Sequence, residues 1–490
     1  MANAAEEMGS GPTHGGALNH PRRGQGEGKV GPRGRAGGEE DLRKGEVEET
    51  NVQGGRGMMR RIVLAILAGT LFSAIAVAAS TPNTITIGMI SAFTGVFSSF
   101  GEMQKQGAIL ALEEAKYTVA GKKINVIYAD DQLDNEQAVT KAKQLVEQDK
   151  VDILTGLVSG DEGLSVGSYM KDKKIPVVPM YSASEDMTMR EWYPFVVRPT
   201  WTGAQPLDVF GYWLAKEKGY KKIYMIGEDY SYPYNQGGGF KRGFYRGGGL
   251  EVKTIWHPVP TSDYSSVIAS IPLDKGYDAV LYNGAGSDAV AFVKQYVELG
   301  MLKKIPLIGQ SNTFEKPDLD SMPSDIVGAL SAHLTADDMS TPAWTKFRDA
   351  FAKRWGHNPS AASEFAYGCM RLILRSIEKQ KGDVTDKAAL VKAMHDSDIS
   401  DSPRGPVRLD EYNAAVENVY IRQVAMGKDG AMYNKGLFTV KQVSQFGPYD
   451  SNLYLKQQPD SRTYPPDLRS DVPPDMLKVS KEYKFLPFGQ

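Results

Sequence analysis

The stretch Val151–Ser184 constrains the fold more than any other part of the chain, because its pattern predicts a strand, a helix and a second strand in immediate succession. Two short apolar runs, Ile153–Val158 and Ile175–Val178, flank a segment with helical spacing at Leu164–Lys173. This order and spacing are typical of a βαβ unit, whose two strands are parallel.

Small polar residues follow both strands of this unit. Ser159-Gly160 closes the first strand, and Tyr181-Ser182-Ala183-Ser184 closes the second. Ligands of open parallel sheets bind just beyond the carboxyl ends of the strands. Hydroxyl groups and free backbone N–H groups at that edge could hold a small anion such as a carboxylate.

The alternation of strands and helices extends over most of the chain and predicts two α/β lobes. In the first lobe, besides the βαβ unit, we expect strands at Ile85–Ile90, Ile124–Ala129 and Phe195–Pro199. Helices are expected between them at Gln104–Lys116 and Asn135–Gln148. A second series of alternating helices and strands begins near Thr202. Its helices are expected at Gln205–Lys218, Phe240–Arg246, Tyr264–Ile271 and Asp288–Leu299, and its strands at Lys222–Ile226, Glu251–Trp256, Ala279–Tyr282 and Pro306–Gly309.

After Val327 the pattern changes to longer helices followed by short strands. The helices are expected at Ala343–Trp355, Ser363–Lys379 and Lys387–Met394, and the strands at Val407–Leu409, Asn418–Gln423 and Leu437–Val440. From residue 442 to 490 the chain is rich in Pro, Tyr and Asp and shows little periodicity. We expect this tail to be extended on the surface of the lobes.

The N-terminal segment predicts export. Residues 1–57 are rich in Gly, Arg and Glu and are expected to be disordered. Residues 58–79 have two arginines, the apolar run Ile62–Ala78 and an A-x-A end, which is the layout of a cleaved signal peptide. The alternative is a membrane anchor, since a mainly apolar run of 17 residues is near the lower limit for a span. If translation starts at Met58 or Met59, residues 1–57 are a gene-start artefact.

Composition excludes several classes of protein. A length of 490 residues is enough for two or three domains. The net charge of −2 gives no indication of a nucleic-acid partner. The single Cys369 excludes an internal disulfide, and the six histidines lack metal-binding spacing. We therefore expect no metal and no cofactor.

Two short motifs resemble enzyme signatures, but each lacks a feature that the enzyme site requires. Gly163–Gly167 matches G-x-S-x-G, yet Ser165 falls inside the expected helix and not on the turn after a strand. Gly284–Ala289 matches G-x-G-x-x-A, yet the next strand ends in Ile308–Ser311 without the acid that binds a ribose. Gly284–Ala289 is better interpreted as a tight turn from strand to helix, where the backbone can approach a ligand. We expect no catalytic residues in this chain.

A tyrosine-rich stretch, Glu228–Tyr234, follows a strand of the second lobe. Tyrosine offers a flat apolar face with a polar tip, which suits a small organic ligand, and we select Tyr232. The glycine triplets at 237–239 and 247–249 lack the ending of a phosphate loop, so they are expected to be flexible ends of a short helix.

The chain resembles the type I periplasmic solute-binding proteins of ABC importers, in particular the group that binds branched-chain amino acids, amides and aromatic acids. The order and spacing of several segments carry the resemblance, which extends from about Thr84 to Val440. They are ITIGMISAFTGVFSSFGEMQKQGAILALEEA, INVIYADDQLDNEQAVTKAKQLV, DILTGLVSG, IPVVPMYSAS, FVVRPT, YMIGEDYSYPY and the tail SQFGPYDSNLYLKQQPDSRTYPP.

The resemblance implies two Rossmann-like lobes with parallel sheets, joined by three crossovers, with one ligand in the cleft. The N-terminal lobe is expected at 83–200 and 330–410, and the C-terminal lobe at 201–329 and 411–441. Hinges are expected near 198–202, 327–334 and 408–414.

The resemblance also implies the ligand-binding positions. They fall on the loop before the first helix, on the ends of strands in the first lobe and on three loops of the second lobe. The residues are Phe97, Phe100, Ser159, Gly160, Met180, Tyr181, Ser182, Tyr232, Ala285 and Ser311.

We therefore expect a monomeric, periplasmic binding protein that delivers a small organic solute to the permease subunits of an ABC importer. Amino-acid binders of this family place an acidic residue and a tyrosine where this chain has Ser311 and Ala285. The expected solute is a carboxylate without an α-ammonium, such as an aromatic or other organic acid. The alternatives are a branched-chain amino acid or amide, a sensor of the same fold that docks on a receptor, and an α/β enzyme.

Overall fold

The computed structural model describes residues 83–479 and 481–490. The predictions for residues 1–57 and for the signal peptide at 58–79 lie outside the described residues. Within the described part, no helix is both long and apolar enough to cross a membrane.

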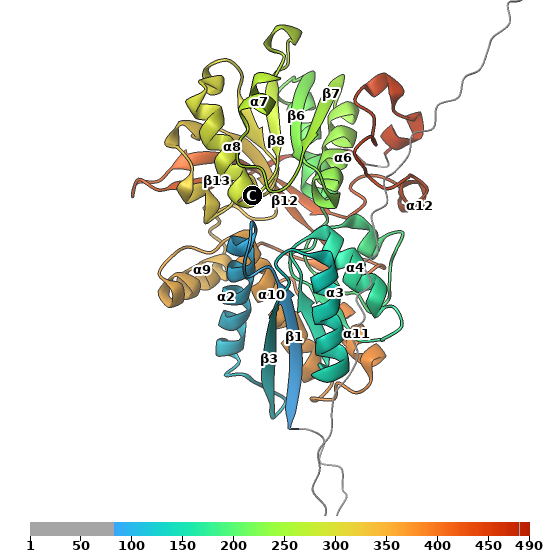
Figure 1. The fold of residues 1–490 in the computed structure, drawn as a ribbon. Helices are drawn as coiled ribbons and strands as arrows, with labels where there is room; N and C mark the ends of the chain where they lie inside the picture. Colours follow the sequence, from blue (N-terminus) through green and yellow to red (C-terminus); the bar gives the residue numbers. More distant parts are fainter. Residues whose placement is uncertain (1–82, 480) are drawn as a thin grey trace, which may run out of the picture. The chain divides into compact units, whose positions relative to one another are not determined.

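The first lobe is built on a five-stranded sheet with the order β2-β3-β1-β4-β5. Figure 1 labels two of its neighbouring strands, β1 and β3. The pairs β1–β3, β1–β4 and β4–β5 are parallel, and the short β2 pairs antiparallel to β3. The strands are β1 Thr84–Ser91, β2 Thr118–Val119, β3 Lys122–Asp130, β4 Ile153–Gly156 and β5 Val177–Pro179.

Helices cover both faces of this sheet because neighbouring residues of the buried strands point to opposite sides. In β1, Ile87 and Met89 pack in one core with α2 and α10, whereas Ile90 packs in another core with α3 and α4. The helices are α2 Ser98–Glu114, α3 Asn135–Lys143, the π-helical continuation Gln144–Gln148, α4 Gly160–Met170, α9 Pro342–Trp355, α10 Ala361–Lys379 and α11 Lys387–His395.

The second lobe contains a larger, mixed sheet with the order β14-β13-β12-β10-β9-β8-β6-β7, to which β11 adds beside β12. The strands from β7 to β10 are parallel, as expected, but β10, β12, β13 and β14 pair antiparallel, so this sheet has an antiparallel part that the sequence pattern did not predict. The strands are β6 Lys222–Glu228, β7 Glu251–His257, β8 Ala279–Asn283, β9 Leu307–Gly309, β10 Leu330–His333, β11 Arg408–Leu409, β12 Ala415–Met426, β13 Met432–Val443 and β14 Leu486–Pro487.

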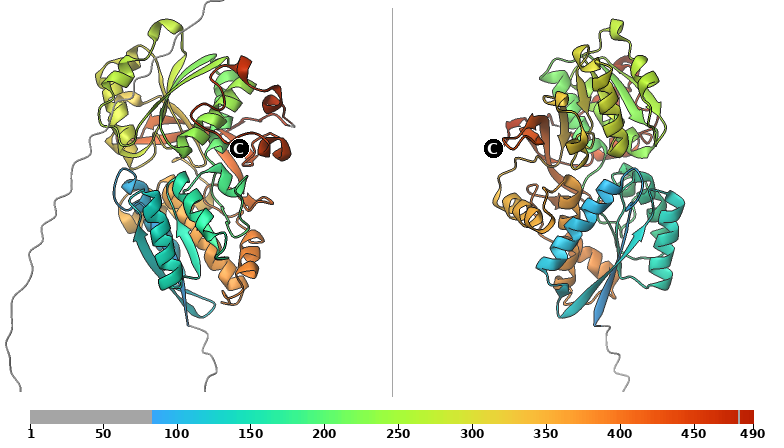
Figure 2. Two further views of the ribbon diagram at one scale, coloured as in Figure 1. Left: turned by 45° about the vertical axis from the view of Figure 1, so that its right-hand side comes forward. Right: turned by 60° about the vertical axis from the view of Figure 1, so that its left-hand side comes forward.

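Two pairs of helices flank this sheet, as two further views show (Figure 2). Helices α5 and α6 pack on one face, and α7 and α8 pack on the other. Their bounds are α5 Ala204–Lys216, α6 Ser231–Arg246, α7 Ser265–Ala269 and α8 Gly286–Glu298; short 3₁₀ turns lie at 185–188, 273–275, 301–303, 318–321, 324–326, 469–471 and 474–477.

The chain passes between the two sheets three times, as expected. The first passage follows the bridge between Val177 and Val196, where no regular strand forms at 195–199. The second passage follows β10, which belongs to the second sheet, so the lobe boundary lies after His333 and not before Leu330. The third passage leads from α11 to β11 and β12.

Helix α6 is longer than expected, because its glycine triplet lies inside the helix. A side chain at Gly239 or Gly243 would lie within 2.5 Å or 1.9 Å of a backbone oxygen of α5. The glycines therefore allow α5 and α6 to pack in close contact. The second half of the tyrosine-rich stretch, Ser231–Tyr234, forms the first turn of α6.

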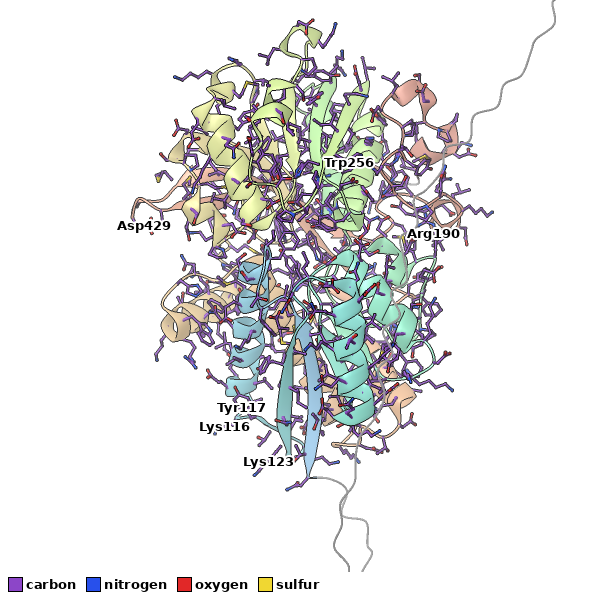
Figure 3. The ribbon with its side chains drawn as sticks, in the orientation of Figure 1. Lys116, Tyr117, Lys123, Arg190, Trp256 and Asp429 are labelled. Atoms are coloured by element: carbon purple, nitrogen blue, oxygen red, sulfur yellow. The ribbon has the colours of Figure 1, made fainter. Side chains whose placement is uncertain are left out.

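The tail at 442–490 lies on the lobes as expected but is partly folded. It contains the short helix α12 Ser451–Leu455 and the edge strand β14. Arg190 and Trp256, both labelled in Figure 3, donate hydrogen bonds to tail carbonyls, and these two residues come from different lobes.

Candidate functional site

The N-terminus of α4 lies at the carboxyl edge of the first sheet. Ser159 is the N-cap: its Oγ accepts a hydrogen bond from the backbone N–H of Asp161 (3.2 Å). Glu162 accepts hydrogen bonds from the backbone N–H groups of Ser159 (2.8 Å) and Val158 (3.1 Å), which completes a capping box. The Ser159 hydroxyl proton remains available to a ligand, at the positive end of the helix dipole.

Ser165 lies inside α4, as the sequence predicts, and therefore not on a nucleophile turn. Gly286 begins α8 with a φ of +64°, and a Cβ there would lie 2.6 Å from the Phe97 ring and 2.7 Å from the Val96 carbonyl oxygen. The G-x-G-x-x-A turn thus lets the loop of the first lobe approach the second lobe.

Six aromatic rings form a closed circuit at the junction of the lobes. Each ring contacts the next, with centroid distances from 5.3 to 6.3 Å. In order around the circuit they are Phe97, Phe100, Tyr181, Trp201, Tyr232 and Tyr230.

The circuit surrounds a cavity of about 20 Å³. That is room for about one water molecule, so an organic solute enters only when rings or lobes move. Val158, Ser159, Ala285 and Asn312 complete the lining. None of the described residues that line the cavity is charged.

Six of the ten residues selected from the sequence line this cavity: Phe97, Phe100, Ser159, Tyr181, Tyr232 and Ala285.

The other four selected residues do not line it. The Ser182 hydroxyl donates to Sδ of Met187 (3.3 Å), and Met180 is fully buried after β5. The Ser311 hydroxyl donates to Oε1 of Gln236 (3.4 Å). Gly160 packs against the start of α6, where its Cβ would lie 2.9 Å from Oγ of Ser231.

Four lining residues were not selected from the sequence. Tyr230 belongs to the tyrosine-rich stretch, and Val158 was assigned to the expected strand end. Trp201 lies in the first crossover, where its indole N–H donates to the Tyr181 carbonyl oxygen (2.9 Å). Asn312 follows Ser311, and its proximity to Tyr181 and Ser159 depends on how the lobes meet.

The hydroxyl groups of the lining tyrosines have partners within the protein. Tyr232 donates to Oε1 of Gln310 (2.8 Å), and the Gln310 amide nitrogen donates to the Gly284 carbonyl oxygen (2.9 Å). Tyr181 donates to Oδ1 of Asn312 across the lobes (2.8 Å). The Tyr230 hydroxyl interacts with the Glu228 carboxylate. These tyrosines therefore offer mainly their ring faces to a solute.

Nearby carboxylates lie behind the lining. Glu315 pairs with Arg422 (3.0 Å), and both side chains are fully buried. Glu228 accepts a hydrogen bond from the Ala285 N–H (3.0 Å), and burial raises its pKa well above the usual range. Asp229 pairs with Arg462 (3.2 Å) outside the cavity. Among the described residues, no group of His, Cys, Asp and Glu is arranged to hold a metal ion.

Comparison with known proteins agrees with this architecture. The profile of periplasmic binding proteins matches residues 84–431. The Leu/Ile/Val-binding protein homolog 6 of Brucella melitensis is 30% identical over 391 residues, which cover 78% of this chain and 97% of that protein.

Solved structures of solute-binding proteins from Rhodopseudomonas palustris are also similar. One, in complex with 3,4-dihydroxybenzoic acid, is 28% identical with a TM-score of 0.69, and the match covers 74% of this chain and 98% of that one. Another, in complex with 4-hydroxybenzoate, is 27% identical with a TM-score of 0.69, and the match covers 73% and 97%. This chain therefore belongs to the periplasmic binding protein family, whose fold and role are those of solute-binding transport proteins.

Proposed function

We propose that the protein captures a small organic acid, in the first place an aromatic carboxylate, between its lobes for delivery to an ABC importer. The observation that carries the proposal is the circuit of six aromatic rings beside the N-terminus of α4, in a lining without charged side chains. Aromatic walls favour a flat apolar body, and a few placed polar groups orient it.

The carboxylate is assigned to the first lobe. Among the described residues, none accepts the Ser159 hydroxyl proton, and the hydroxyl lies at the N-terminus of α4, which carries a partial positive charge. Hydrogen bonds to a charged acceptor are short and strong. The two similar Rhodopseudomonas proteins, which were solved with hydroxylated benzoic acids, support this class of solute.

Among the described residues, no ionised and unpaired carboxylate lines this site to receive an α-ammonium. A buried cation without an acidic partner is costly. Glu315 pairs with Arg422, and Glu228, whose pKa burial raises well above the usual range, lies behind Ala285. The site therefore favours acids without an α-amino group.

Binding of a branched-chain amino acid is the second candidate, because the similar Brucella protein is named as a Leu/Ile/Val-binding protein homolog. In that case Glu228 would have to ionise and become exposed to the cavity.

Export and delivery complete the proposal. A signal peptide at 58–79 would direct the mature chain to the periplasm, where it would act as a monomer and dock on permease subunits. Sequencing the N-terminus of periplasmic protein tests export: a start near Ala79 or Ser80 supports it, and a start within residues 1–57 contradicts it.

A thermal-shift screen of the purified protein tests the class of solute, because a ligand that binds only the folded state raises the melting temperature. Benzoate and its hydroxylated derivatives should raise it, whereas benzamide and leucine should do so less. The screen should include trimethylglycine, since aromatic cages also bind quaternary ammonium groups. A shift with leucine or trimethylglycine and none with the acids would contradict the proposal.

A further inference from the structure

The protonation of His333 is fixed by its surroundings. His333 ends β10, is fully buried and stacks on Trp201 with a centroid distance of 5.0 Å. Its Nδ1 accepts a hydrogen bond from the backbone N–H of Leu334 (2.7 Å). Burial, with the neighbouring Arg422 and Arg404, lowers the His333 pKa well below its usual value. A neutral imidazole that accepts at Nδ1 carries its proton on Nε2, so Nε2 is a donor.

This donor fixes the orientation of the Asn312 side-chain amide. Nε2 of His333 lies 3.1 Å from the side chain of Asn312, so the atom that faces it must be the acceptor Oδ1. The Tyr181 hydroxyl donates to the same oxygen (2.8 Å). With both acceptor positions of Oδ1 occupied, a rotation of the amide by 180° would place two N–H donors against the His333 donor. The orientation is therefore locked.

The locked amide directs its other atom to the solute. Asn312 lines the cavity and is only 4% exposed. Its backbone N–H donates to Oε1 of Gln310 (2.7 Å), but among the described residues no acceptor binds its Nδ2 group. The Nδ2 group therefore contributes N–H donors, and no acceptor, to the second-lobe side of the cavity.

We propose that Asn312 is a specificity-determining residue that reads an oxygen acceptor on the end of the solute opposite to the carboxylate. The inference rests on the proposed function, in which Ser159 and α4 hold the carboxylate in the first lobe. A solute that spans from Ser159 to Asn312 carries an oxygen at its far end, as a 4-hydroxy- or 4-carboxy-substituted aromatic acid does. An ammonium at that end meets only donors and is rejected.

The substitution Asn312→Asp tests this reading with almost no change in shape. One Asp oxygen still accepts from Tyr181 and His333, while the other replaces the donor with a negative charge. Calorimetry should show that 4-hydroxybenzoate binding weakens at least about 100-fold. Binding of 4-(aminomethyl)benzoate, which places an ammonium at the far end, should strengthen in the variant.

Asn358→Asp is the matched control. Asn358 is exposed and does not line this cavity, so the substitution adds the same charge elsewhere on the protein. It should change neither affinity by more than about threefold. If buried charge unfolds the Asp variant, Asn312→Leu removes the donor without adding charge. That variant should bind 4-hydroxybenzoate and 4-methylbenzoate equally, whereas the wild type prefers the hydroxyl compound.

The outcomes separate the inference from the proposed function. If the wild type binds aromatic acids but the Asp and Leu variants keep its order of preference, Asn312 does not read the solute and the inference fails alone. If the wild type binds no acid, the proposed function fails. The inference, which assumes a carboxylate held at Ser159, then fails with it.

Discussion

At the scale of single residues, Ser159 and Ser182 differ in whether their hydroxyl groups line the cavity. Both serines follow a strand of the first sheet, so the sequence alone predicts both as ligand-binding residues. Ser159 caps α4 and lines the cavity, whereas Ser182 donates to Met187. The difference arises from the direction of each side chain after the strand, which no pattern of residue types encodes.

Replacing these two serines with alanine should therefore have unequal effects. Ser159→Ala should weaken binding of an aromatic acid by roughly 1.5–3 kcal/mol, because a charged acceptor loses its hydroxyl donor. Ser182→Ala should change the affinity by less than about threefold. Calorimetry on both variants measures this, and equal losses would contradict the assignment of Ser159.

A second prediction at this scale concerns Asp318, which connects the lobes by accepting a hydrogen bond from the Ser99 hydroxyl (3.3 Å). Burial raises the Asp318 pKa to about 6. In an open form, water would return the pKa toward its ordinary value, so closure takes up a proton. Closure, and with it solute affinity, should rise as pH falls through about 6, by at most about tenfold per pH unit.

Calorimetry at pH 7, 6 and 5 checks the sign. Asp318→Asn should bind more tightly at pH 7 and lose this part of the pH dependence, whereas the exposed Asp325→Asn should behave like the wild type. An Asp318→Asn variant with unchanged pH dependence would show that another group takes up the proton.

At the scale of elements, the buried parallel strands were predictable because they are short apolar runs with helices between them. β10 was not, since Leu330–His333 is short and includes Ser331 and a buried histidine. α6 was underestimated because glycine disfavours an isolated helix, and only close packing on α5 compensates. The candidate site was predictable at strand ends, but Trp201 and Asn312 meet it only through the contact of two lobes.

The turn at Gly286 gives a prediction for lobe closure. Gly286→Ala would place a methyl group against the Phe97 ring and the Val96 carbonyl, besides straining a positive φ. Solute affinity should fall at least about tenfold. Gly300→Ala is the control: its φ is +68° and no atom lies within 4 Å of the new Cβ, so it should lose about 1 kcal/mol of stability with unchanged affinity.

The tail gives a prediction for stability. Asp460 accepts two hydrogen bonds from Arg242 of α6 (2.5 and 2.9 Å), and both side chains are buried. Asp460→Asn removes the two hydrogen bonds of Arg242 to a carboxylate and leaves it only the more distant Glu185 (3.7 Å), so it should lower the free energy of unfolding by about 3 kcal/mol. Asp475→Asn removes an exposed pair with Lys478 and should cost less than about 1 kcal/mol. Similar unfolding midpoints in urea for both variants would contradict this.

At the scale of the whole molecule, two α/β lobes meet at a cavity that neither lobe forms alone. Ser159, Phe97 and Tyr181 come from the first lobe, and Tyr232, Ala285 and Asn312 from the second. The cavity of about 20 Å³ means that a solute exchanges only when the lobes or rings separate. Binding of the solute and closure of the lobes around it are therefore expected to occur together.

Calorimetry with pairs of compounds that differ only in the α-amino group shows whether the cavity prefers acids without an ammonium. Suitable pairs are phenylacetate with phenylglycine, 3-phenylpropionate with phenylalanine, and 4-methylpentanoate with leucine. In each pair the acid without the amino group should bind more tightly, by at least about tenfold, since Glu315 is already paired with Arg422 and burial raises the pKa of Glu228 well above its usual range. Tighter binding of the amino acid in each pair would contradict this prediction.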